Sequence, residues 1–163
     1  MLIYIARHAW AGDYGDPNWP DDSQRPLTPE GIERYRDVVS ALATCDFAPE
    51  RIATSPYARC VQTAELIAVG LEHAPPIEEL EALAVGSELD PVLEWSATTG
   101  AESVCWVGHS PDVERMAAQL ISDGTASVRF AKGSVAAIRF DGETPRPGEG
   151  TLLWHATAKL LGV

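Results

Sequence analysis

Two histidines and two arginines follow segments of the chain that are predicted to be buried strands or helix starts. Arg7 and His8 come directly after the apolar run at 2–6, His109 follows a second apolar run, and Arg59 lies about one turn into a predicted helix. Arginine binds phosphate oxygens bidentately and keeps its charge. A neutral imidazole can attack phosphorus, and a protonated one adds positive charge beside the oxyanion. These residue types together suit the binding and transfer of a phosphoryl group.

The elements around these residues alternate between strands and helices, which indicates an α/β fold with a largely parallel sheet at its centre. The predicted strands are 2–6, 51–54, 103–107, 134–140 and 151–157, with a further short strand within 75–83. Thr28, Ser55 and Ser110 are each followed by proline, so each is predicted to cap a helix that its proline begins. The region 75–100 holds a further helix, which Pro91 begins or breaks.

The carboxyl ends of the strands are the expected place for a ligand, because helix N-termini there present free N–H groups. Three separate segments send Arg7, His8, Arg59 and His109 to this one rim. Any one of these residues alone is more often structural or solvated than catalytic. The prediction of a site therefore depends on their convergence.

Length and charge set limits on such a site. The 163 residues suffice for a single domain over 1–163 with one hydrophobic core. The formal charge of −12 repels polyanions, so neither nucleic acid nor a membrane surface is an expected partner. No apolar run is long enough for a signal-peptide core or a bilayer span, and a cytoplasmic location is expected. Cys45, Cys60 and Cys105 lie in segments that look helical or buried and are expected to be reduced.

Four motifs in this order resemble the histidine phosphatase superfamily. They are Arg7-His8, the RPLT of 25–28 that opens a helix, SPYARCVQTAE at 55–65 and VGHSP at 107–111. Their order and the short chain are similar to the small SixA-type phosphohistidine phosphatase branch, although many members of the superfamily have glycine at the position of Ala9. The resemblance implies a three-layer α/β/α sandwich with a mostly parallel central sheet, that is, a phosphoglycerate mutase-like fold.

The resemblance also implies a mechanism. His8 is the implied nucleophile, which takes the phosphoryl group to give a phosphohistidine intermediate that water then hydrolyses. Arg7, Arg59 and His109 are implied to hold the phosphoryl oxygens, with Arg25 of the RPLT motif close enough to help. No metal or organic cofactor is implied, since arginines and a protonated histidine can neutralise the charge that Mg²⁺ neutralises elsewhere.

Other residues are weaker candidates for the site. Ser55 and Ser110, at predicted helix N-termini beside the expected pocket, are candidate substrate-binding residues. A carboxylate after the second helix supplies the leaving-group proton in many members of the superfamily, and Glu81 is chosen here for that role. Surface charge is the simpler interpretation of Glu81 and its neighbours Glu78, Glu79 and Glu88. A phosphoramidate such as phosphohistidine needs less help, because its leaving nitrogen is readily protonated.

The predicted function is a metal-independent phosphatase that hydrolyses phosphohistidine in a phosphorylated protein. One alternative is a phosphatase of small phosphomonoesters, such as a sugar phosphate or a nucleotide. Another is a non-catalytic module that binds a phospho-ligand, against which the presence of His8 argues. The loop after the first strand is either ordinary packing, the simpler interpretation, or a cover that selects substrates. Its aromatic and acidic residues are Trp10, Asp13, Tyr14, Asp16, Trp19, Asp21 and Asp22.

Overall fold

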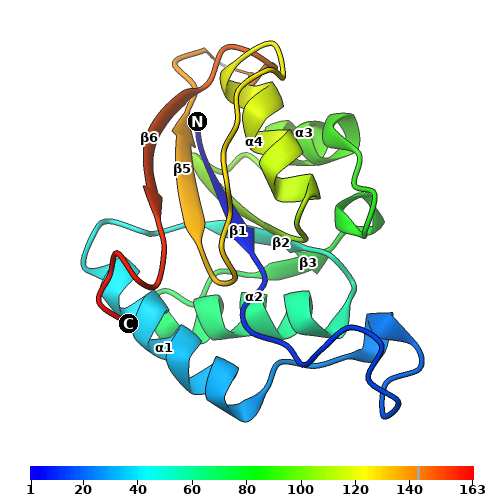
Figure 1. Cartoon of the computed structure of the whole chain (residues 1–163). Helices are drawn as coiled ribbons and strands as arrows, with labels where there is room; N and C mark the ends of the chain where they lie inside the picture. Colours follow the sequence, from blue (N-terminus) through cyan, green and yellow to red (C-terminus); the bar gives the residue numbers. More distant parts are fainter. Residues whose placement is uncertain (143) are drawn as a thin grey trace.

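A six-stranded sheet with the strand order β3-β2-β4-β1-β5-β6 forms the centre of the computed structural model, which describes residues 1–142 and 144–163 (Figure 1). The strands are β1 (Leu2–Arg7), β2 (Arg51–Thr54), β3 (Ile77–Glu79), β4 (Ser103–Gly108), β5 (Val135–Arg139) and β6 (Thr151–Ala156). The first four are parallel to one another, and β5 and β6 are added antiparallel at one edge. The predicted strands and the mostly parallel sheet are confirmed.

Helices cover both faces of this sheet (Figure 1). They are α1 (Pro29–Ala43), α2 (Ala58–Gly70), α3 (Leu89–Thr98) and α4 (Asp112–Ile121), with short 3₁₀ helices at Asp22–Gln24 and Glu81–Leu83. Successive side chains of β1 point to opposite faces, so Tyr4 packs with residues of α1 and α2, and Ile5 with residues of α3 and α4. The three-layer α/β/α sandwich is confirmed. Across the described ranges, no helix combines the length and apolar character needed to cross a bilayer.

The predicted helix caps are partly correct. Thr28 caps α1 as expected, because its Oγ1 accepts a hydrogen bond of 3.0 Å from the Gly31 N–H. The predictions for Ser55 and Ser110 are wrong, since α2 and α4 have Tyr57 and Pro111 at their N-caps. The two serines lie in the segments that follow β2 and β4, and their hydroxyls form hydrogen bonds with His109 and Glu114.

Two further details differ from the sequence expectations. Helix α3 begins at Leu89, so Pro91 lies inside its first turn, where a missing N–H costs no intrahelical hydrogen bond. All three cysteines are free, and Cys60 and Cys105 are buried as expected, but Cys45 is exposed just beyond the end of α1.

The register of the parallel strands places their carboxyl ends at one level. Arg7 of β1 pairs with Gly108 of β4, and Thr54 of β2 pairs with Val107. The residues that follow these strands, His8, Ser55 and His109, therefore emerge side by side at one edge of the sheet.

Candidate active site

The His8 ring is fixed by the backbone around it. The His8 N–H donates to the Gly108 carbonyl at 3.0 Å, and the His8 carbonyl accepts from the Gly133 N–H at 3.1 Å. Nδ1 lies 2.7 Å from the carbonyl oxygen of Ala9, which can only accept, so Nδ1 carries the hydrogen. The lone pair of the neutral ring is then on Nε2, with which no hydrogen bond is recorded in the described residues. His8 is thus held in the tautomer that leaves Nε2 available as a nucleophile.

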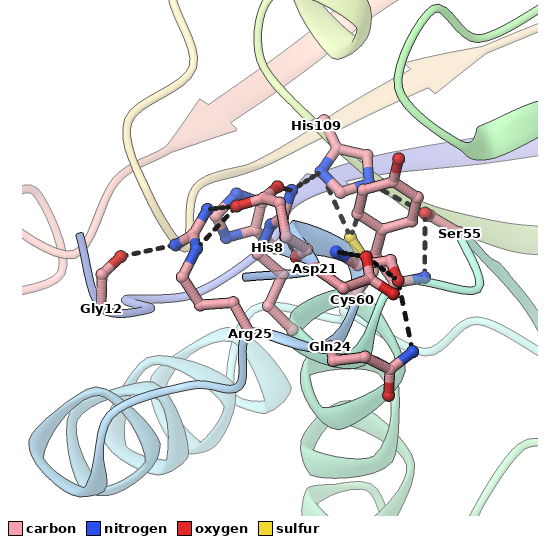
Figure 2. A network of polar contacts seen from close by, with 12 residues as sticks. His8, Gly12, Asp21, Gln24, Arg25, Ser55, Cys60 and His109 are labelled. Atoms are coloured by element: carbon pink, nitrogen blue, oxygen red, sulfur yellow. Dashed lines mark hydrogen bonds and ion pairs between the residues drawn. The ribbon is translucent and has the colours of Figure 1, made fainter. Parts of the chain in front are cut away.

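His109 stands beside His8, with the two ring centroids 5.5 Å apart. Nε2 of His109 is 2.8 Å from the Ser55 hydroxyl (Figure 2). Nδ1 of His109 is 3.2 Å from Nη2 of Arg59. Because an arginine nitrogen can only donate, Nδ1 accepts and the Nε2–H donates to Ser55. Ser55 is fully buried and orients the ring of His109 from behind.

Arg25 and Arg59 meet at a carboxylate that lies between them. Asp22 Oδ1 accepts from Nε of Arg25 at 2.8 Å, and Oδ2 lies 3.0 Å from Nη2 of Arg59. Nη1 of Arg59 also donates to the Asp22 carbonyl at 2.8 Å, and Nη1 of Arg25 donates to the carbonyl of Gly12. Burial raises the pKa of Asp22, but the hydrogen bond from Arg25 and the charge of Arg59 outweigh this and bring it below its ordinary value. The loop thus fastens both guanidinium groups.

Arg7 approaches the site from the other side. Its Nη1 donates to the Phe130 carbonyl at 2.8 Å, which fixes the guanidinium against the segment before β5. Its Nε is buried and has no hydrogen-bond partner among the described residues, and the same holds for Nε of Arg59. Buried N–H groups without partners are costly, so each can gain by donating to an incoming anion.

Burial makes both imidazoles harder to protonate. It lowers the pKa of His8 to about 3, an effect that the charges of Arg59 and His109 reinforce. Burial and the charge of Arg59 lower the pKa of His109 to about 4. At neutral pH both rings are therefore neutral, which suits His8 as a nucleophile. The negative charge of a bound anion raises the pKa of His109 again, so the protonated imidazole expected beside the oxyanion belongs to the state with bound substrate.

Cys60 lies under the same ring, with Sγ 3.5 Å from Nε2 of His109. Burial raises the pKa of this thiol to about 12, so it stays protonated at neutral pH. Cys60 therefore packs against His109 as a small apolar group.

A cavity of about 340 Å³ opens at this edge of the sheet. It is lined by Arg7, His8, Gly12, Asp13, Tyr14, Asp22, Arg25, Arg59, Val85, His109, Ser110 and Lys132. The structure therefore brings together Arg7, His8, Arg25, Arg59 and His109. Among the described residues that line the cavity, four are cations and two are carboxylates, and the carboxylate of Asp22 is already paired with arginines.

Of the other predicted site residues, Ser55 and Glu81 lie outside the cavity wall, and Ser110 lies in it. Ser55 is behind His109 and not in the cavity wall. Ser110 does line the cavity, but its hydroxyl donates to Glu114 Oε1 at 2.8 Å. Glu81 is exposed in the 3₁₀ helix that follows β3 and is not among the lining residues.

Two charged residues that line the cavity were not predicted in these positions: Asp22 was expected only as part of a loop that either packs or covers the site, and Lys132 was not expected at the site. Asp22 precedes Arg25 by three residues, a spacing at which the two side chains of a turn can pair, so a local signal existed. Lys132 reaches the cavity from the segment between α4 and β5, and no local pattern marks it.

This geometry can hold a phosphoryl group and attack it. Arginines provide fixed positive charge and planar donors for its oxygens, and Nε2 of His8 provides a lone pair. Preorganised charge of this kind is what phosphoryl transfer needs, because the charge in its transition state is spread over the phosphoryl oxygens.

Comparisons with known proteins agree with this chemistry. Residues 3–86 match the family model described as histidine phosphatase superfamily (branch 1). The chain is 28% identical over 158 residues to the phosphohistidine phosphatase SixA of Escherichia coli, covering 95% of this chain and 92% of SixA.

Solved structures agree as well. The structure of the protein histidine phosphatase SixA complexed with tungstate superposes with a TM-score of 0.83 at 27% identity, covering 99% of each chain. A phosphoglycerate mutase from Bacillus anthracis shares the fold, with a TM-score of 0.64 at 13% identity over 99% of this chain and 95% of the other. The predicted phosphoglycerate mutase-like fold is thereby confirmed. The chain belongs to the histidine phosphatase superfamily, branch 1, and is a phosphatase.

Proposed function

We propose that this phosphatase hydrolyses phosphohistidine on a protein, with His8 as the nucleophile. The observation that carries the proposal is the hydrogen bond from Nδ1 of His8 to the Ala9 carbonyl, which leaves the Nε2 lone pair available in a cavity lined by Arg7, Arg25 and Arg59. The similarity to SixA along nearly the whole chain supports phosphohistidine as the substrate class.

The proposed reaction has two steps. Nε2 of His8 forms a bond to phosphorus while the P–N bond of the substrate breaks, and the departing imidazole nitrogen keeps the electron pair and takes a proton from solvent. Water then attacks the phosphorus of the phosphorylated His8 and the P–Nε2 bond breaks. The phosphate formed keeps one proton of the water and returns the other to solvent, and His8 is left neutral. Arg7, Arg25 and Arg59 stabilise the charge on the phosphoryl oxygens in both steps.

Proton donors at the cavity bear on the choice between a phosphoramidate and an ester. An imidazole leaving group is readily protonated, whereas an alkoxide needs a general acid positioned near it. Of the two carboxylates that line the cavity, Asp22 is paired with Arg25 and Arg59. An engaged carboxylate of lowered pKa is a poor acid, and this favours phosphohistidine.

Asp13 is the observation that favours the alternative, a small phosphomonoester. It is exposed, lines the cavity and forms no ion pair within the described residues. A carboxyl group at this place can protonate an alcohol leaving group, a role for which the exposed Glu81 is poorly placed.

A substrate panel decides between the two. We expect kcat/KM for a phosphohistidine protein to exceed that for sugar phosphates and nucleotides, and Asp13→Asn to leave phosphohistidine turnover within about twofold. Glu81→Gln serves as a matched carboxylate control outside the cavity. Ester turnover far above phosphohistidine turnover, lost in Asp13→Asn and kept in Glu81→Gln, would reverse the assignment.

A further inference from the structure

A second cavity of about 450 Å³ adjoins the active site and is strongly basic. Arg7 and Lys132 line both cavities, so the two are neighbours at the same edge of the molecule. The other cations that line the second cavity are Arg34, Arg129 and Lys159, and no carboxylate of residues 1–142 or 144–163 lines it. We call these five residues and the cavity that they line the basic subsite.

The basic subsite concentrates the unpaired positive charge of an acidic protein. Among the described residues, six of the twelve lysines and arginines have a side-chain carboxylate within 4.0 Å: Arg25, Arg36, Arg51, Arg59, Arg115 and Arg139. Five of the remaining six line the basic subsite, and in the part of the chain that the structure describes none of these five forms an ion pair with an aspartate or glutamate side chain; Arg34 donates instead to the backbone oxygen of Val163. In a chain of net charge −12, this is a local reversal of the overall charge.

These cations come from distant segments that the fold gathers. Arg34 lies on α1, Arg129 and Lys132 lie between α4 and β5, and Lys159 follows β6, whose C-terminal continuation runs beside α1 (Figure 1). Arg34 is stacked on the Trp10 ring at 4.2 Å and donates to the carbonyl of Val163. The stacking holds one cation of the basic subsite in place.

The carboxylate of Glu114 acts electrostatically on one residue of the basic subsite, Arg7, and is itself hydrogen-bonded. Glu114 acts on Arg7 and raises its pKa, although burial lowers that pKa by more and the charge of Arg129 adds to the lowering. Oε1 of Glu114 accepts from the Ser110 hydroxyl and from the N–H of Phe130. Glu114 keeps its negative charge in these hydrogen bonds with neutral donors, but within the described residues it forms no ion pair with Arg34, Arg129 or Lys159.

We propose that the basic subsite docks acidic side chains that flank the phosphorylated histidine of a protein substrate. This inference rests on the proposed function and names what its substrate presents beside the phosphoryl group. The three cations that line the second cavity alone, Arg34, Arg129 and Lys159, are exposed. An exposed ion pair contributes little on its own, so these cations serve better as a set facing several carboxylates on a protein surface than as a binding site for one small anion.

The test uses two peptides that carry the same phosphohistidine, flanked by glutamates in one and by glutamines in the other. We expect the wild-type enzyme to give a higher kcat/KM on the glutamate peptide. The double variant Arg129→Gln/Lys159→Gln should lower that advantage about fivefold, consistent with two exposed pairs. A control double variant, Arg36→Gln/Arg139→Gln, removes the same charge from exposed positions outside both cavities and should keep the advantage.

Two further readouts separate the possible failures. All variants should hydrolyse p-nitrophenyl phosphate equally, and about 0.5 M NaCl should remove the glutamate advantage because exposed charges are screened.

If no phosphohistidine peptide is hydrolysed, the proposed function fails. Docking is then measured as stronger inhibition of p-nitrophenyl phosphate turnover by the unphosphorylated glutamate peptide. Equal behaviour of the two peptides, or an equal loss in both double variants, overturns the docking proposal. A small bisphosphonate is also tested as an inhibitor of p-nitrophenyl phosphate turnover. If Arg129→Gln/Lys159→Gln weakens inhibition by the bisphosphonate and leaves the glutamate advantage unchanged, the docking proposal is overturned in favour of a small anionic substrate.

Discussion

Oδ2 of Asp22 lies 3.0 Å from Nη2 of Arg59, so a carboxylate of the loop after β1 forms an ion pair with a guanidinium that lines the cavity. The same carboxylate holds Arg25 through Oδ1. Asp22 therefore has two opposite effects on the site: it orients two arginines, and it adds negative charge where a phosphoryl group must bind.

Asp22→Asn separates these two effects. We expect kcat to fall about tenfold, because arginines that are no longer fastened stabilise the transition state less well. Competitive inhibition by inorganic phosphate should become stronger, since one negative charge has left the cavity wall. Steady-state kinetics with phosphate as inhibitor measures both effects. Unchanged kcat together with unchanged inhibition would show that Asp22 has neither role.

Ser55 is expected to act through His109. Removing its hydroxyl in Ser55→Ala leaves the buried Nε2–H of His109 without its acceptor and frees the ring to turn, and we expect kcat to fall about tenfold. The matched control is Ser110→Ala, whose hydroxyl pairs with Glu114 and not with a histidine, and which should change kcat less than about threefold. The pH profile of kcat should also move in Ser55→Ala, because a ring that turns changes its distance from the charge of Arg59, which lowers the pKa of His109. Equal effects of both substitutions on kcat would contradict the role given to Ser55.

The neutral histidines predict how stability depends on pH. Burial holds the pKa of His8 at about 3 and that of His109 at about 4, against 6.5 in the unfolded chain. Below about pH 6.5 the unfolded chain therefore binds protons that the folded chain does not, and the free energy of unfolding falls as the pH falls. Each histidine contributes about 1 kcal/mol per pH unit between about pH 6 and the folded pKa.

Urea unfolding from about pH 7 to about pH 5 measures this dependence. The wild type should lose stability more steeply than His8→Asn, in which one of the two titrating groups is gone. Parallel curves for the two proteins would mean that His8 has an ordinary pKa in the folded state.

The parallel core of the fold was predictable because its signals are local and redundant. The uninterrupted apolar runs of β1 and β4 are typical of strands buried on both faces, and the Thr28-Pro29 pair marks the start of α1 in sequence and in structure. The location of the site at the rim of the sheet was predictable because the carboxyl ends of parallel strands lie at one edge. His8 and His109 could therefore be placed in one site.

The details that could not be predicted depend on tertiary partners. Ser55 and Ser110 have the residue type and sequence position of helix caps. Their hydroxyls form hydrogen bonds with His109 and Glu114 instead, and the helices begin after Tyr57 and Pro111. The basic subsite is assembled from segments far apart in sequence, so no window of the sequence contains its charge pattern. Tertiary contact overrides local preference at these places.

The role of His8 is open to a direct chemical measurement. The enzyme is mixed with a phosphohistidine protein, quenched in alkali during turnover, and examined by peptide mass spectrometry and ³¹P NMR. We expect a phosphoryl group on His8, bonded to Nε2, because Nδ1 carries the hydrogen that binds the Ala9 carbonyl. His8→Ala should lose turnover while still binding vanadate, and Arg59→Ala should weaken both. A phosphoryl group on His109 or on no histidine, or parental turnover by His8→Ala, would contradict the mechanism.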